Sequence, residues 1–180
     1  DLNYQEVLHD LLALFPDFLQ QTIKKAPTFF ENQQQFILIK KCFESLMVFD
    51  QYIKIRDEEI VKLFKQLYNY LETQKDPKIL EFLAHCISQL FKNNINLRII
   101  EKHYEHSKPI IPFLLSLQLP PGAIYELKSF ILQSQINDLP TLIEIWTICS
   151  NSPVKSDHPI LIDICATLLT SFQPDSIQLF

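Results

Sequence analysis

The chain has 180 residues, of which 47% are hydrophobic and 21% are charged, and this composition is that of a globular domain rather than a disordered segment. Its single glycine, Gly122, argues against phosphate-binding loops, dinucleotide fingerprints and nucleophile elbows, because each needs glycine where the backbone bends sharply. The net charge of −5 is unevenly spread: 1–23 hold four acids and no Lys or Arg, 24–108 hold 14 basic and 11 acidic residues, and 109–180 hold two basic and six acidic residues.

Apolar residues recur every three or four positions along the chain, which predicts a series of amphipathic helices and no convincing strand. The first helix is expected over 3–15, with an apolar set of Tyr4, Val7, Leu8, Leu11, Leu14 and Phe15. Pro16 is expected to interrupt it before a short helix that runs to about residue 25. Further helices are predicted from about 32 to 49, over 57–72, and from the capping Asp76 to about 91.

The second half of the chain is predicted as five shorter helices. They are expected from a capping Asn96 to about 106, from about 109 to 117, from about 121 to 134, from about 138 through Cys149, and from about 158 to 172. The residues from Pro174 onward have the pattern of one more helix start.

Helix starts near 3, 32, 57, 76, 96, 121, 138 and 158 place two helices in roughly 40 residues. In this period the whole chain resembles HEAT/armadillo-like α-solenoids, although the armadillo W-x-x-x-N pattern is absent, since Trp146 is followed four residues later by Ser150. We therefore expect an all-α fold of antiparallel helical hairpins, stacked as a short HEAT-like α-solenoid in one domain (1–180) of a longer protein. An irregular solenoid or a compact all-α domain with similar hairpins fits the pattern equally.

The resemblance implies partner binding, because HEAT-like families mostly serve as scaffolds. We expect a non-enzymatic protein–protein interaction scaffold or adaptor of a larger complex, with no cofactor and no small-molecule substrate. Residues 109–180 carry so few charges that a partner is expected to cover part of their surface. The expected partner-binding residues are aromatic and lie in or next to this region: Tyr125, Phe130, Trp146 and Phe180.

The lysine-rich middle, 24–108, suggests an alternative, a helical repeat associated with nucleic acid. Lys40, Lys41, Lys62 and Lys65 are the candidate basic patch. Lysines interleaved with acids are also typical of a solvated helix face, and the chain has only two arginines to read bases or bind phosphate with two hydrogen bonds.

Other reactive side chains do not form a recognisable catalytic or metal site. His103 and His106 are one helical turn apart and can share a metal, but no third ligand is indicated, so we expect a polar helix end. His85 and Cys86 lack an orienting Asp or Asn nearby, so we expect no catalytic residues and no bound metal. Ser152 precedes a proline, a pattern for proline-directed phosphorylation that also fits a plain helix-breaking turn.

The cysteines and the hydrophobic runs indicate the compartment. The four cysteines form no C-x-x-C pair, no signal-peptide pattern opens the chain, and no apolar run reaches the roughly 20 residues that span a bilayer. The sequence therefore predicts a cytoplasmic or nuclear protein that does not enter a membrane.

Overall fold

The computed structural model describes residues 4–25, 28–50, 57–103, 110–134, 136, 139–151 and 158–172. All secondary structure in these residues is helical, which confirms the predicted all-α class. The elements are α1 (Tyr4–Lys25), η1 (Phe29–Asn32, a 3-10 helix), α2 (Gln33–Asp50), α3 (Asp57–Thr73), α4 (Pro77–Phe91), α5 (Asn94–His103), α6 (Ile110–Ser116), α7 (Pro121–Gln133), α8 (Leu139–Ser150) and α9 (His158–Ser171).

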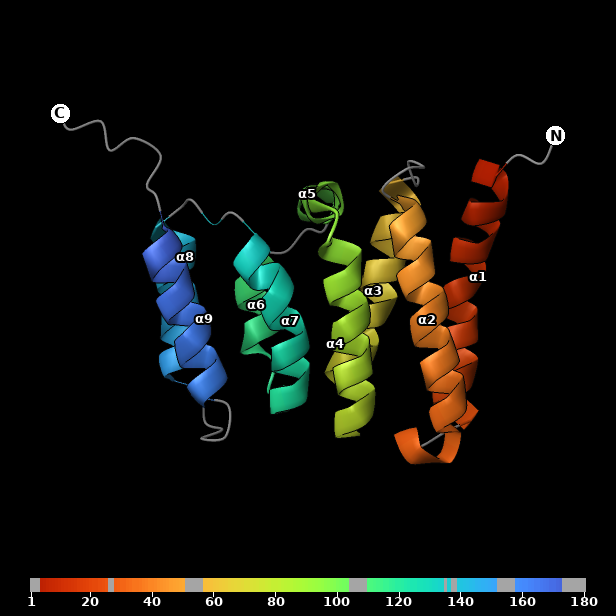
Figure 1. The fold of residues 1–180 in the computed structure, drawn as a ribbon, viewed down its shortest axis with the longest axis horizontal. Coiled ribbons are helices and arrows are strands. Elements are labelled where there is room, and N and C mark those ends of the chain that lie inside the picture. Colours follow the sequence, from red (N-terminus) through yellow and green to blue (C-terminus); the bar gives the residue numbers. More distant parts are fainter. Residues whose placement is uncertain are drawn as a thin grey trace.

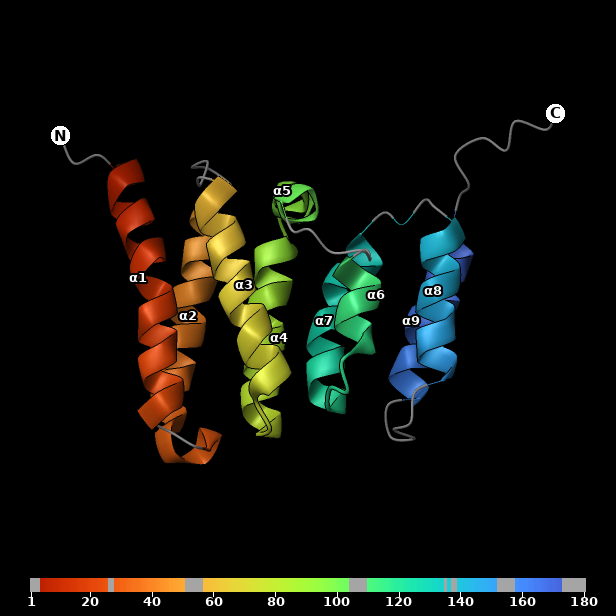
Figure 2. The same ribbon diagram turned by 180° about the vertical axis from the view of Figure 1, so that it is seen from behind.

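The long helices form two rows (Figures 1 and 2). One row contains α1, α3, α6 and α8, the other contains α2, α4, α7 and α9, and α5 lies across the top of α3 and α4. The chain passes from one row to the other and back, so that the first row runs down and the second runs up in Figure 1. This order places α1 and α2 at one end of the molecule and α8 and α9 at the other.

Buried apolar side chains form one continuous cluster from Leu12 in α1 to Leu168 in α9. Helix α4 is buried on most of its circumference because it packs against α2, α3, α5 and α7. Helix α3 buries a single stripe, as its sequence predicts: Ile60, Leu63, Phe64, Leu67, Tyr68 and Leu71.

The start of α4 confirms the predicted cap. The Asp76 carboxylate accepts hydrogen bonds from the backbone N–H groups of Lys78 (2.8 Å) and Ile79 (3.1 Å), and Pro77 occupies the first helical position. A second oxygen of Asp76 accepts from the N–H of Phe29 at 3.2 Å. This carboxylate therefore also holds η1 against the start of α4.

Two predicted helix boundaries are wrong. Helix α1 continues through Pro16, because residues on both sides of the proline bury one apolar face (Leu12 and Phe15 before it, Leu19 and Ile23 after it) and this burial outweighs the lost backbone hydrogen bond.

The cap of α5 is also not the predicted residue. The Asn93 side chain accepts from the N–H of Ile95 at 3.1 Å, so α5 begins at Asn94. Asn96 is buried, and its amide donates to the carbonyl of Leu90 at 2.9 Å, where it satisfies a carbonyl of the last turn of α4.

Within the described residues, no helix combines the length and the apolar composition that crossing a bilayer requires.

Candidate partner-binding surfaces

The predicted aromatic residues differ in how far they reach the surface. Trp146 is 51% exposed on α8, and Tyr125 is 65% exposed on α7. Phe130 is only 2% exposed and packs its ring 5.1 Å from that of Phe91, which corrects the expectation that it contacts a partner. The prediction for Phe180 lies outside the described residues.

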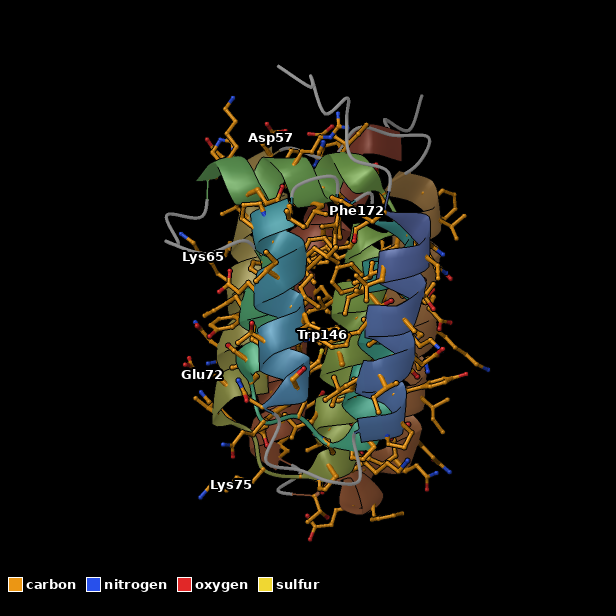
Figure 3. All side chains as sticks on the ribbon, turned by 90° about the vertical axis from the view of Figure 1, so that its left-hand side faces the viewer. Asp57, Lys65, Glu72, Lys75, Trp146 and Phe172 are labelled. Carbon is orange, nitrogen blue, oxygen red and sulfur yellow. The ribbon has the colours of Figure 1, made fainter. Side chains whose placement is uncertain are left out.

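The end of the molecule formed by α8 and α9 has an exposed apolar face, which we call the α8–α9 face. Its members are all at least half exposed: Leu139, Ile143 and Trp146 on α8, and Ile162 and Leu169 on α9. In Figure 3, which looks directly at this end, Trp146 lies between the two helices. Beneath the face, Ile145, Cys149, Ile164, Cys165 and Leu168 fill the space between the helices and the core.

Few charges accompany this face. The only charged side chain of α8 is Glu144, and the only carboxylate of α9 is Asp163, which forms an ion pair with Lys128 of α7. A helix that is apolar around most of its circumference is usually covered. Helices α8 and α9 are therefore apolar on their exposed side as well as on their buried side.

The opposite end exposes a second apolar face, on α1. The structure buries Leu12, Phe15, Leu19 and Ile23, and it exposes Val7, Leu11, Leu14 and Phe18. The predicted apolar set therefore combines two sides of the helix, since Phe15 is buried whereas Val7, Leu11 and Leu14 are exposed. Apolar residues occur on two sides of this helix, so its periodicity alone did not determine which side meets the core.

A groove between η1, α2, α4 and α7 encloses a cavity of about 230 Å³. The volume is below the roughly 300–1,000 Å³ of pockets that hold drug-sized ligands. Four of its lining side chains are phenylalanines, and its lining carboxylates already have partners: Glu81 pairs with Lys78, and Glu126 with His85, both at 2.7 Å. The groove is therefore smaller than such pockets, and both carboxylates that line it are paired.

His85 of α4 contacts carboxylates from two neighbouring helices. Its Nε2 lies 2.7 Å from Oε1 of Glu44 on α2, and its Nδ1 lies 2.7 Å from Oε2 of Glu126 on α7. An imidazole with a hydrogen on each nitrogen donates to both carboxylates, whereas a neutral ring has one N–H to donate. One side chain therefore links three helices of the second row. Its place within the apolar stretch 79–91 was the only sequence signal for a buried histidine that needs polar partners.

The four candidate lysines do not gather in one patch. Lys40 and Lys41 belong to α2, and Lys40 lines the groove against α4 and α7. Lys62 and Lys65 belong to α3 in the other row, and Figure 3 places Lys65 at the outer side of that row. The expected basic patch is therefore divided between the two sides of the molecule.

The remaining reactive side chains that the sequence analysis considered are Cys86, His103, His106 and Ser152. Burial raises the pKa of the Cys86 thiol, which opposes formation of the thiolate that a nucleophile needs. His103 uses Nδ1 to contact the carbonyl of Ile99 at 2.8 Å, and the described part of the chain contains no group of three or more metal-ligating side chains. His106 and Ser152 lie outside the described residues.

Comparisons of the chain with protein families, with curated proteins and with solved structures found no match.

Proposed function

We propose that the protein is a non-enzymatic interaction module, a scaffold or adaptor of a larger complex, that binds another protein through the α8–α9 face. In this proposal its helices are HEAT-like hairpins stacked as a short α-solenoid, an architecture that offers long helix surfaces to partners. The proposal also places the protein in the cytoplasm or nucleus.

The contacts of His85 support the repeat interpretation. Glu44 precedes His85 by 41 residues, and Glu126 follows it by 41 residues. The three residues lie on α2, α4 and α7, which are successive helices of one row, and their side chains meet. Equal offsets between equivalent positions are what a stacked repeat of about 40 residues produces.

The observation that carries the proposed function is the α8–α9 face itself. Soluble monomers rarely expose a contiguous apolar patch of many large side chains, and patches of this kind often mark protein contacts. Tryptophan is enriched among the residues that dominate binding energy, and Trp146 lies between the two helices of the face. Since the face has few charges, its partner surface is also apolar, and we expect the contact to persist at high salt.

Site-specific photocrosslinking tests this proposal. The photoreactive amino acid p-benzoylphenylalanine replaces Trp146 in the full chain, expressed in its native cells, and a control chain carries it instead of the exposed Glu72 of α3, which Figure 3 shows on the side of the molecule. We expect discrete adducts with another protein from position 146 and none from position 72. Failure to form adducts at position 146, or the same adducts at both positions, would contradict the proposal.

A variant pair separates binding from folding. Ile143→Ser combined with Trp146→Ser should abolish co-purification of the partner that the crosslinking identified, because both substitutions remove apolar area from the face. Phe49→Ser on α2 is the matched control, since Phe49 is exposed to a similar extent at the other end of the molecule. Both proteins should keep the far-UV circular dichroism of the wild type.

A further inference from the structure

Helix α1 exposes an ordered apolar row beside the face that it buries against α2 and α3. Val7, Leu11, Leu14 and Phe18 are 41, 50, 62 and 48% exposed. Their spacing of four, three and four residues places them within about 60° of the helix circumference. This is the spacing with which one helix packs along another.

A row of acids borders the apolar row on one side. Glu6, Asp10 and Asp17 are exposed and lie within about 40° of one another, roughly 90° around the helix from the centre of the apolar row. None of them forms an ion pair with another described residue, and α1 has no Lys or Arg before Lys24. Burial, and then the Asp17 carboxylate, raise the pKa of the Tyr70 hydroxyl of α3.

We infer that the outer face of α1 binds an amphipathic helix of a partner protein whose apolar stripe is bordered by lysine or arginine. The apolar rows of the two helices pack together, and the partner's cations lie along Glu6, Asp10 and Asp17. Apolar area supplies most of the affinity in such a contact, and charges at its edge select the partner and its orientation. The inference concerns a different helix from the α8–α9 face and does not depend on the function proposed there.

The acid row also distinguishes this occupant from two others. In an antiparallel pair of copies that meet through α1, a twofold axis would bring both acid rows to the same edge, where like charges repel. An anionic lipid surface would be repelled by the same three carboxylates. A basic helix is the occupant whose charge complements the face.

The test uses the full chain and two fluorescein-labelled helical peptides of roughly 20 residues. Both peptides have the same leucine stripe, which is bordered by lysines in one and by glutamates in the other. By fluorescence anisotropy the lysine peptide should bind at least about tenfold more tightly than the glutamate peptide. Equal affinities for the two peptides, or no binding of either, would overturn the inference.

Reversing the charge of the acid row on α1 tests the inference more sharply than the comparison of the two peptides. Asp10→Lys combined with Asp17→Lys should reverse the preference, so that the glutamate peptide binds more tightly. Leu14→Ser should weaken both peptides by about tenfold, whereas Leu38→Ser, at an exposed leucine of α2, should weaken neither. If the double reversal fails to fold, Asp10→Asn with Asp17→Asn should still abolish the preference. An unchanged preference, or a dimer in sedimentation that Leu14→Ser dissociates, would refute the basic-helix occupant.

Discussion

The two ends of the molecule expose apolar side chains to a similar extent but differ in charge. On α1 the apolar row is bordered by three acids, whereas α8 and α9 carry one carboxylate each, and that of Asp163 is paired with Lys128. Apolar area alone would let both ends bind the same surfaces. The comparison shows how bordering charges can give two faces of similar apolar character different partners.

The largest expected effect is the loss of stability when a buried aromatic side chain is removed, compared with the loss for an exposed one of the α8–α9 face. Phe130→Ala should lower the free energy of unfolding by about 3–5 kcal/mol, because it leaves a cavity where a buried ring packed. Trp146→Ala should lower it by less than about 1 kcal/mol, since the indole is half exposed. Urea denaturation followed by circular dichroism measures both values. A loss at Trp146 as large as that at Phe130 would mean that the face belongs to the core and is not a free surface.

The next effect is the loss of stability when a histidine that links neighbouring helices is removed. His85→Ala should lower the free energy of unfolding by about 1–3 kcal/mol, because it removes two hydrogen bonds between helices. His9→Ala removes one such contact, the 2.7 Å pair between His9 of α1 and Glu59 of α3, and should cost about 0.5–1.5 kcal/mol. The same denaturation assay compares them. A larger loss for His9→Ala would show that the attachment of α1 matters more than the three-helix link.

The smallest expected effect is the pH dependence of stability that the buried Cys86 thiol of α4 produces. Burial raises the pKa of the Cys86 thiol above its ordinary value of 9.0, so the folded chain keeps the proton where the unfolded chain ionises, and stability falls as the pH rises above that value. Between about pH 8 and 10 the loss should be about 1 kcal/mol, and Cys86→Ala should reduce it.

The same denaturation experiment also measures whether the two ends of the molecule unfold together. Trp146 fluorescence reports the α8 end, and circular dichroism reports the whole chain. Separate transitions by the two signals would show that the α8–α9 end unfolds independently.

The sequence correctly predicted the elements whose residue pattern is compatible with only one structure. Helix α3 has one apolar stripe, and the Asp76-Pro77 pair is a start signal that few other structures use. Local periodicity and capping were sufficient in these places.

Other features depend on tertiary packing and could not be predicted locally. Helix α1 has apolar residues on two sides, and only its neighbours α2 and α3 determine that Leu12 is buried while Leu11 is exposed. The same holds for the aromatic residues of the second half, where Phe130 faces α4 and Trp146 faces outward. Periodicity identifies the stripes of a helix, but which stripe is covered depends on the position of the helix within the fold.

The most direct test of the difference between the two ends is amide chemical-shift mapping of the isotope-labelled full chain with the lysine peptide, at about 50 and about 300 mM salt. We predict shifts confined to α1 and its immediate neighbours, which diminish at the higher salt, while the indole N–H of Trp146 stays unchanged. Shifts centred on α8 and α9, or shifts on α1 that salt does not reduce, would contradict the claim that bordering charge separates the partners of the two ends.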